Sequence, residues 1–580
     1  MATLQGRMSR GHQYWYIVES RRVNGKPRPI VLAYLGKADD LLVRLQGIAE
    51  NVKLKSYSHG AVAALLQIAD EMDVCNIINR QIQSERQKSS AKPIRHNLTA
   101  GATFLLGAIN RLCSPTSKRG FYDWAKTSSL EYLLRTNLSK VDSQHFWDLM
   151  DALPVNHIEF IEQELVKKAF ELYSIDKGSL FFDTTNFFTY IHTTNERCAI
   201  AKRGRNKQKR NDLRQVGLAL VVTQKDMMPL FHLTYEGNRH DSKVFNSIIE
   251  KLKERMMALK MDIGSHTVVF DRGNNSRENL DLLKEAGIHY VGALTPYQHK
   301  ALTLEAIDHL ALLKIGDQMW QVYRTKEVIW DEEQTVIVFI SENLKAGQLG
   351  WIYQQIEKAE KPLRDIKEKA AKKPLTSKEK ELAEDKVIVL LREKKLNELI
   401  SFSWHEVGND HFVFSYTIEE EKIKNLEETL GIRIIMTSRH EWETAKIMEA
   451  YHGQSHIEHS FKNMKNPYHL GIRPQFHWTD QKIKVHFFIC VMGYLLATLL
   501  WKKAKEKAGF AGTLDNFLDR LNNIRLGSML ETDTGKRGAV KAIYKLEEME
   551  SDEKILAQAL NLETYHTNRP KLSGVSVYTS

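Results

Sequence analysis

The sequence is poor in cysteine. It has four cysteines in 580 residues and no Cys-x-x-Cys pair: Cys75, Cys113, Cys198 and Cys490. Thiols so few and so far apart argue against a disulfide scaffold or a structural zinc finger, and they favour a reducing compartment. The N-terminal residues MATLQGRMSRGHQYWY also lack the apolar segment of a secretory signal. We therefore expect a cytoplasmic protein.

Long hydrophobic runs are scarce as well. One run, VHFFICVMGYLLATLLW, spans 17 residues between Lys484 and Lys502, whereas a helix needs about 20 apolar residues to cross a bilayer. We expect this run to form a helix buried inside a soluble protein. The sequence contains no internal repeat and no low-complexity tract.

The overall composition is that of a globular protein, with 42% hydrophobic and 27% charged residues. The length predicts about three to five folding units. The formal net charge is +11, and residues 1–150 hold 21 Lys/Arg against 12 Asp/Glu, so most of the excess lies in the first quarter of the chain. A positive field concentrated in this way is typical of a module that binds a polyanion such as DNA.

The N-terminal part, residues 1–172, is expected to be the DNA-binding region. Residues 13–36 contain two β-rich runs around Asn24-Gly25, which predicts a β-hairpin. From about residue 57 to 172 the apolar spacing is helical. Four basic residues cluster at the hairpin tip and are candidate DNA contacts: Arg21, Arg22, Lys26 and Arg28.

The central part of the sequence has the pattern of an α/β fold. The β-rich runs lie at 179–191, 216–223, 228–235, 266–273 and 289–294, and helical patterns lie at 242–259 and 276–286. This order predicts a mixed sheet with flanking helices. We place the catalytic core in residues 173–295 and 431–510, a β-rich insertion with a charged helical arm (355–398) in 296–430, and a helical C-terminal region in 511–580.

Two acidic residues belong to apolar strands of this core. Asp183 lies within SLFFDTTNFF, and Asp271 ends HTVVFD. A carboxylate in a buried strand is costly unless it is paired or bound to a cation, although an Asp at a strand end can also cap the next turn. Two such residues in adjacent strands favour a metal site.

A third acidic residue lies in a predicted helix from Glu441 to about Lys465. Tyr451, Gln454, Glu458, Lys462 and Lys465 follow one another at spacings of three and four, so they share one face of a helix. Two lysines close to a carboxylate suit a DNA phosphate that approaches a metal site. A solvated helix with a surface Glu–Lys pair is the simpler alternative.

These residues resemble the Asp-Asp-Glu (DDE) triad of bacterial insertion-sequence transposases. Asp183, Asp271 and Glu458, the last in Y-x2-Q-x3-E-x6-K, are similar to the branch with a β-rich insertion between the second Asp and the Glu. The hairpin, the stretch PLFHLTYEGNRHDSKVF and the stretch LGIRPQFHWTDQKIKVHFFICVMGYLLATLL resemble that family too. The gaps of 88 residues and 187 residues between the three acids suit this branch.

The resemblance implies an RNase H-like core interrupted by the insertion, with a mostly helical N-terminal region and a helical C-terminal region. It implies a nucleoid-associated DNA transposase that binds the terminal inverted repeats of its own insertion sequence, acts on target DNA, and works as a homodimer or larger assembly, since two ends must be cut and joined. The triad would be both catalytic and metal-binding, and its oxygen ligands suit two Mg²⁺ ions about 4 Å apart, with Mn²⁺ as a substitute. Candidate DNA contacts near the triad are Tyr451, Gln454, Lys462, Lys465 and Arg272.

The sequence departs from the family pattern at two places. Gln454 stands where the family has Arg, so a bidentate phosphate contact is missing. Asn274 and Asn275 occupy the stretch after the second Asp, where members that cut through a DNA hairpin have an aromatic residue. Two alternatives therefore stay open: an inactive DNA-binding protein on the same fold, and a metal-dependent nuclease without transfer activity.

Other polar motifs have weaker interpretations. His452 and His456 have the spacing of a helical zinc pair, with His459 nearby, but the glutamate of an HExxH motif is absent. His240-Asp241 is either a helix start or a pair near the active site. Residues 202–214, with seven Lys/Arg and one acid, are either a loop that follows DNA phosphates or a solvated loop.

Overall fold

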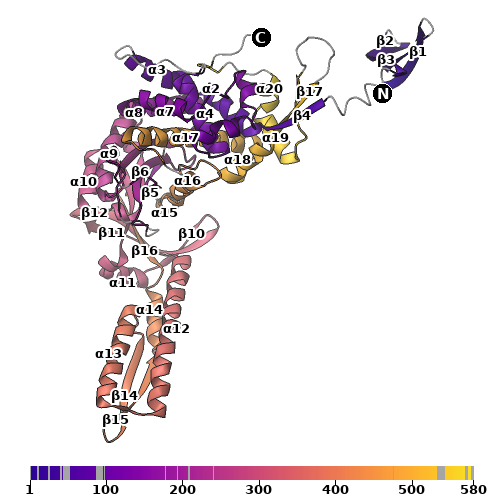
Figure 1. The fold of residues 1–580 in the computed structure, drawn as a ribbon. Coiled ribbons are helices and arrows are strands. Elements are labelled where there is room, and N and C mark those ends of the chain that lie inside the picture. The colour runs from indigo at the N-terminus through magenta and orange to yellow at the C-terminus, as the bar shows by residue number, and fades with distance from the viewer. Residues whose placement is uncertain are drawn as a thin grey trace. The chain divides into compact units, whose positions relative to one another are not determined.

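The structure is a computed structural model in which the chain forms two compact units, coloured along the sequence in Figure 1. It describes the chain except residues 1, 10–11, 24–25, 40–41, 43–51, 87–95, 97, 177, 193, 205, 207–209, 240, 474–475, 532–541, 568–571 and 576–580. Side chains are also left undescribed at 2, 21–23, 26–28, 52, 83–86, 241–242, 455–456, 531, 564 and 566. The first unit comprises Met1–Ala152, Pro467–Leu470 and Leu499–Ser580, and the second comprises Leu153–Asn466 and Gly471–Thr498.

The first unit begins with the predicted hairpin. Strand β1 (Ala2–Ser9) pairs with β2 (His12–Val23), and β2 pairs with β3 (Lys26–Lys37) in antiparallel register. Val23 opposes Lys26, so the connection is two residues long, as expected for Asn24-Gly25, which lies outside the described residues. The side chains of the four basic residues at the tip are likewise outside the description.

Helices from the N-terminal sequence and elements from the C-terminal sequence make up the rest of this unit. The helices are α2 (Gly60–Glu71), α3 (Val74–Arg86), α4 (Ala100–Cys113), α5 (Phe121–Ala125), α6 (Leu130–Leu134), α7 (Ser143–Ala152), α18 (Leu514–Asn523), α19 (Ser551–Ala559) and α20 (Leu562–Thr567). The mostly helical character expected for the N-terminal part is confirmed.

The C-terminal part is not wholly helical. It contains β17 (Arg525–Glu531) and β18 (Ala542–Leu546), and β17 also pairs with β4 (Val52–Ser58) from the N-terminal part. Leu526 and Ser528 are buried whereas Met529 is exposed, which is the alternation of a half-buried strand. This pairing could not be read from the sequence because its partners lie hundreds of residues apart.

The second unit is built on a nine-stranded mixed sheet. The strands in spatial order are β10 (Ala311–Ile315), β11 (Gln318–Ile329), β12 (Glu332–Ile340), β16 (Ile432–Thr437), β9 (His289–Leu294), β8 (Thr267–Phe270), β5 (Ser179–Thr189), β6 (Arg214–Thr223) and β7 (Pro229–Glu236). β5, β8 and β9 are parallel, and β5, β6 and β7 are antiparallel. The order β7-β6-β5-β8-β9 with these directions is that of an RNase H-like core, so the expected fold class is confirmed.

Helices cover both faces of this sheet. On one face, Phe245 of α9 (Asp241–Ala258) lies against Phe182 of β5 and Phe270 of β8, with ring centroids 5.1 and 4.9 Å apart. The unit also contains α8 (Val155–Leu172), α10 (Arg277–Glu285) and α11 (Lys300–Asp308). Because both faces are covered, β6 is an almost continuous apolar run and is buried over nearly its whole length.

The long apolar run forms the core helix α17 (Asp480–Ala508). Its most apolar 18 residues have a mean hydropathy of 1.9, and 94% of them are buried in the protein. Within the second unit the Phe487 ring packs edge-on against Phe187 of β5, and the Tyr494 hydroxyl donates to the Ser460 hydroxyl at 2.7 Å. The prediction of a buried helix is confirmed.

The segment 296–430 divides into two parts. Strands β10, β11 and β12 extend the large sheet, because β12 pairs with β16 from Thr335–Thr437 to Ile340–Ile432. The remainder has its own core and contains α12 (Glu342–Lys372), α13 (Ser377–Lys394), α14 (Glu420–Glu428) and a small sheet of β13 (Leu375–Thr376), β15 (His411–Ile418) and β14 (Ile400–Gly408).

This remainder is the charged arm, in which α12 and α13 lie beside β15 (Figure 1). The run expected as one helical arm is two helices. Helix α12 ends before Lys373, which has extended dihedral angles, because the following Pro374 disfavours a helical residue before it.

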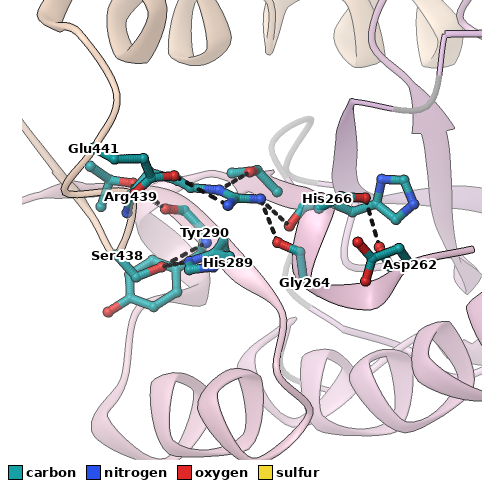
Figure 2. A network of polar contacts seen from close by, with 11 residues as sticks. Asp262, Gly264, His266, His289, Tyr290, Ser438, Arg439 and Glu441 are labelled. Carbon is teal, nitrogen blue, oxygen red and sulfur yellow. Dashed lines mark hydrogen bonds and ion pairs between the residues drawn. The ribbon is translucent and has the colours of Figure 1, made fainter.

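A buried arginine ties the far end of β16 to the start of β8 (Figure 2). The Arg439 guanidinium donates to the Thr267 hydroxyl (3.0 Å), to the Gly264 carbonyl (2.9 Å) and to the His266 carbonyl (3.3 Å), and it pairs with Glu441 at 3.2 Å. Arg439 is 8% exposed, and Thr267 and His266 are buried, so little water can replace its hydrogen bonds to these two residues. The network fixes the end of the sheet opposite to Asp183 and Asp271.

We expect Arg439→Met to lower the free energy of unfolding by about 2–4 kcal/mol, because the Thr267 hydroxyl and the His266 carbonyl lose their donor in a buried place. Urea denaturation followed by circular dichroism measures this change.

Arg364→Met is the matched control. Its guanidinium is exposed on α12 and lies 4.0 Å from Glu360 in a surface pair, so we expect a change below about 0.5 kcal/mol. Equal losses in the two variants would contradict the structural role given to Arg439.

Candidate active site

The pairing of β5 with β8 brings Asp183 and Asp271 side by side. Phe182 opposes Phe270 in the parallel register. The residues that follow them in the chain, Asp183 and Asp271, are therefore also next to each other. Adjacent strands are about 4.8 Å apart, and Asp271 keeps an extended backbone (φ −76°, ψ 159°) just past the end of β8. Both carboxylates therefore project from the same end of the sheet, on the face opposite to α9.

Each carboxylate accepts a hydrogen bond from the next backbone amide. The Thr184 amide donates to Asp183 and the Arg272 amide donates to Asp271, both at 2.7 Å. Asp183 is half-buried and Asp271 is exposed. Asp271 therefore also has the capping role that the sequence left open.

Helix α16 (Ser455–Lys465) runs along β5 on this same face. Gly453, just before the helix, lies so close to Phe181 that an added Cβ would stand 2.6 Å from the ring. At the other end, the Lys465 ammonium donates to the Thr185 hydroxyl and lies 5.5 Å from the Phe187 ring centre. Because alternate residues of a strand share a face, Asp183 lies between these contacts and faces the helix.

Glu458 lies in α16 between those two contacts, and it is exposed. Among the described residues, however, no three Asp, Glu, His or Cys side chains are close enough together to hold a metal ion. Clustered carboxylates repel one another when no cation is present. The side-chain donors of these three acids are carboxylate oxygens, which fit Mg²⁺ or Mn²⁺.

The predicted helix 441–465 is two helices, α15 (Thr444–His452) and α16, separated at Gly453-Gln454. The close approach of Gly453 to Phe181 explains the break. Tyr451 is consequently on a different helix from Glu458, and it is buried. The one shared helix face expected for the five residues is therefore interrupted.

The other expected DNA contacts lie around α16 and β8. Gln454 is half-buried at the start of α16, Lys462 is exposed, and Lys465 is half-buried against β5. Arg272 is exposed directly after Asp271.

Arg433 is a polar residue of this site that the sequence did not single out. Ala293 is the β9 residue level with Asp271 and pairs with Ile435 of β16, so Arg433, two residues from Ile435, lies on the same sheet face. Its guanidinium donates to the Tyr451 hydroxyl at 3.2 Å. Only the register across several strands reveals this placement.

A cavity of about 540 Å³ lies beside Asp271 and Arg433. Its lining includes Asp271, Arg272, Arg433 and Tyr451, and it continues to Gln348 at the base of the charged arm. Two guanidinium groups and a phenol beside a carboxylate suit a phosphodiester. Of the three acids, Asp271 belongs to the lining of this cavity.

The two asparagines after Asp271 have structural partners. The Asn274 main-chain carbonyl accepts from the Asn279 side-chain amide at 2.6 Å, and the Asn275 side-chain amide donates to the Ala293 main-chain carbonyl. These bonds hold the turn between β8 and α10.

The remaining polar motifs are spread over several elements. The His452 ring lies 4.7 Å from the Trp320 ring, and partial burial, together with the nearby Arg433 charge, lowers the pKa of His452. His459 is exposed on α16. Helix α9 begins at Asp241, as one interpretation expected, and residue 240 lies outside the description. In the basic segment Arg210 pairs with Asp212 at 2.8 Å.

Comparison with known proteins assigns the class. The model of the transposase DDE domain matches residues 189–496, just over half of the chain and including Asp271 and Glu458, while Asp183 lies six residues before the matched part. The chain belongs to the DDE transposases of bacterial insertion sequences. More particularly, residues 5–58 match the N-terminal domain of the IS1634 family transposases.

A solved structure is also similar to this chain. The cryo-EM structure of the piggyBac transposase synaptic complex with hairpin DNA aligns with 80% of this chain and 79% of its own, at 8% identity and a TM-score of 0.37. No curated protein sequence shows a significant match.

The contact between Gly453 and Phe181, at the junction of α15 and α16, can be tested by substitution. We expect Gly453→Ala to lower the free energy of unfolding by about 1–3 kcal/mol, because its Cβ would overlap the Phe181 ring. In the Phe181→Leu background the same change should cost about 1 kcal/mol less. Urea denaturation of the four proteins of this cycle measures the coupling.

Gly347→Ala on α12 is the control, since nothing lies within 4 Å of its added Cβ. We expect it to be neutral or stabilising by up to about 1 kcal/mol, because alanine favours a helix more than glycine does. Additive effects of the two changes at Gly453 and Phe181 would contradict the contact.

Proposed function

We propose that this chain binds the terminal inverted repeats of its own insertion sequence and catalyses metal-dependent DNA strand cleavage and strand transfer. The observation that carries the proposal is the β5–β8 register, which makes Asp183 and Asp271 neighbours on the face that α16 and Glu458 cover. The DDE transposase family to which the chain belongs supports the same chemistry.

Asp183, Asp271 and Glu458 are proposed to hold two Mg²⁺ ions, for which Mn²⁺ can substitute. When bound, such ions supply activation of water or of a DNA 3′-hydroxyl and stabilisation of the leaving oxygen. Glu458 completes the set from a helix whose ends are anchored on β5.

The surrounding residues are proposed to position DNA. Arg272 and Arg433 line the cavity beside Asp271 and can each donate two parallel hydrogen bonds to a phosphate. Arg433 thereby offers the guanidinium that is missing at Gln454. Tyr451 orients Arg433 through its hydroxyl, and Lys462 is exposed toward solvent for a neighbouring phosphate.

The terminal repeat itself is proposed to be recognised by the N-terminal region, with the basic hairpin tip at its front. The partners are double-stranded DNA at the element ends and at the target. Because two ends are joined in one reaction, the active form is a homodimer or larger, and the protein works in the cytoplasm on the nucleoid.

Joining of a labelled terminal repeat to a target plasmid in the presence of Mg²⁺ tests this function. Both cleavage and joining are expected. Cleavage without joining would instead indicate a nuclease, and binding without either would indicate an inactive DNA-binding protein.

Substitutions of the three proposed metal ligands test their role in cleavage. Asp183→Asn, Asp271→Asn and Glu458→Gln each remove one negative ligand while keeping the size of the side chain. We expect each to lower the rate of terminal-repeat cleavage about a hundredfold or more, and to leave folding and repeat binding close to wild type. A labelled duplex and circular dichroism give the two measurements.

Asp281→Asn, an exposed acid on α10, is the control and is expected to cut at the wild-type rate. A folded triad variant that cut within about tenfold of wild type would remove that residue from the site, because tenfold is only about 1.4 kcal/mol of barrier.

A further inference from the structure

Three large aromatic side chains are exposed on two neighbouring segments of the second unit. Tyr190, which directly follows β5, is 54% exposed, and Phe476 and Trp478, which precede α17, are 53% and 66% exposed. The Tyr190 and Phe476 rings are 5.6 Å apart at an angle of 33°. Single exposed apolar residues are common, but a group of rings from two distant segments indicates a binding surface. We call these three residues the aromatic platform.

Polar contacts fix the backbone that carries the platform. The Asn195 side-chain amide donates to the Trp478 carbonyl at 3.1 Å, and the Arg214 guanidinium donates to the Asn195 carbonyl at 2.9 Å. The Asp480 carboxylate accepts from the amides of Ala199 (2.9 Å) and Ile200 (3.1 Å). The rings are thus held toward solvent on a rigid support, since these bonds rather than the rings join the two segments.

The charge around the platform favours a polyanion. Arg214, which supports Asn195, ends the basic segment 202–214, in which seven Lys/Arg accompany a single acid. Lys202 and Arg203 of this segment are exposed. Aromatic faces beside a concentration of positive charge are the combination with which proteins bind single-stranded nucleic acid.

We propose that the aromatic platform stacks on unpaired bases of the DNA that this chain binds. This rests on the proposed function, because it names a contact for the DNA that the triad acts on. Unpaired bases are the ligand because a base within a duplex has both faces covered by its neighbours, whereas a frayed or displaced strand offers them. Lys202, Arg203 and Arg210, which are exposed in the described part of this segment, supply the contacts to that strand's phosphates.

Fluorescence anisotropy with the full-length chain tests the proposal. The probes are a labelled 12-nucleotide oligo-dT and a labelled blunt terminal-repeat duplex, both in EDTA so that no cleavage occurs. Trp478→Ala and Phe476→Ala are each expected to weaken oligo-dT binding about tenfold and to leave duplex binding within about twofold. Trp478→Phe keeps a stacking face and should stay within about threefold of wild type.

Trp351→Ala is the matched control, because Trp351 is 46% exposed on α12 in the charged arm. It should leave both probes unaffected. Oligo-dT binding that is unchanged in Trp478→Ala and Phe476→Ala, while the duplex still binds, would overturn the platform and leave the proposed function standing.

Two further outcomes would overturn the proposal in other ways. Equal losses for both probes would indicate a general structural role, and a change confined to self-association in sedimentation would indicate a protein-docking surface. A wild-type chain that bound neither probe would overturn the proposed function together with the platform.

Discussion

The parallel pairing of β5 with β8 is the constraint on which the rest of the site depends. It sets Asp183 beside Asp271, and a slip of one residue would turn one carboxylate to the opposite face of the sheet. The register is held by packing, because Phe182 and Phe270 both meet Phe245 of α9. The apolar face of the sheet thus decides where the acids of the other face lie.

The two ends of the large sheet differ in structure. At one end Arg439 joins β16 to β8 through buried hydrogen bonds, which gives the parallel strands a rigid base. At the other end Asp271 and Arg433 line a cavity of about 540 Å³, and Asp183 lies beside Asp271. Glu458 lies on α16, which contacts β5 through Gly453 and Lys465. The distance of Glu458 from Asp183 and Asp271 therefore depends on these two contacts.

The sequence allowed the local part of this account to be predicted. Apolar runs predicted the core strands, and acids within apolar strands predicted the two Asp positions. It did not predict that β10, β11 and β12 join the large sheet, because strand pairing between distant segments leaves no local pattern. The break before α16 was hidden for a similar reason, since it depends on how closely Gly453 approaches a strand about 270 residues earlier. Arg433 was also missed, because only the register across four strands relates it to the acids.

The most direct test of the central claim is to locate the metal relative to the chain. Fe²⁺ bound in place of Mg²⁺ generates hydroxyl radicals that cut the nearby backbone, and mass spectrometry maps the cuts. The account predicts cuts close to Asp183, Asp271 and Glu458 in the DNA-bound protein, all suppressed by excess Mg²⁺. Cuts near only one of Asp183 and Asp271, or at none of the three segments, would contradict it.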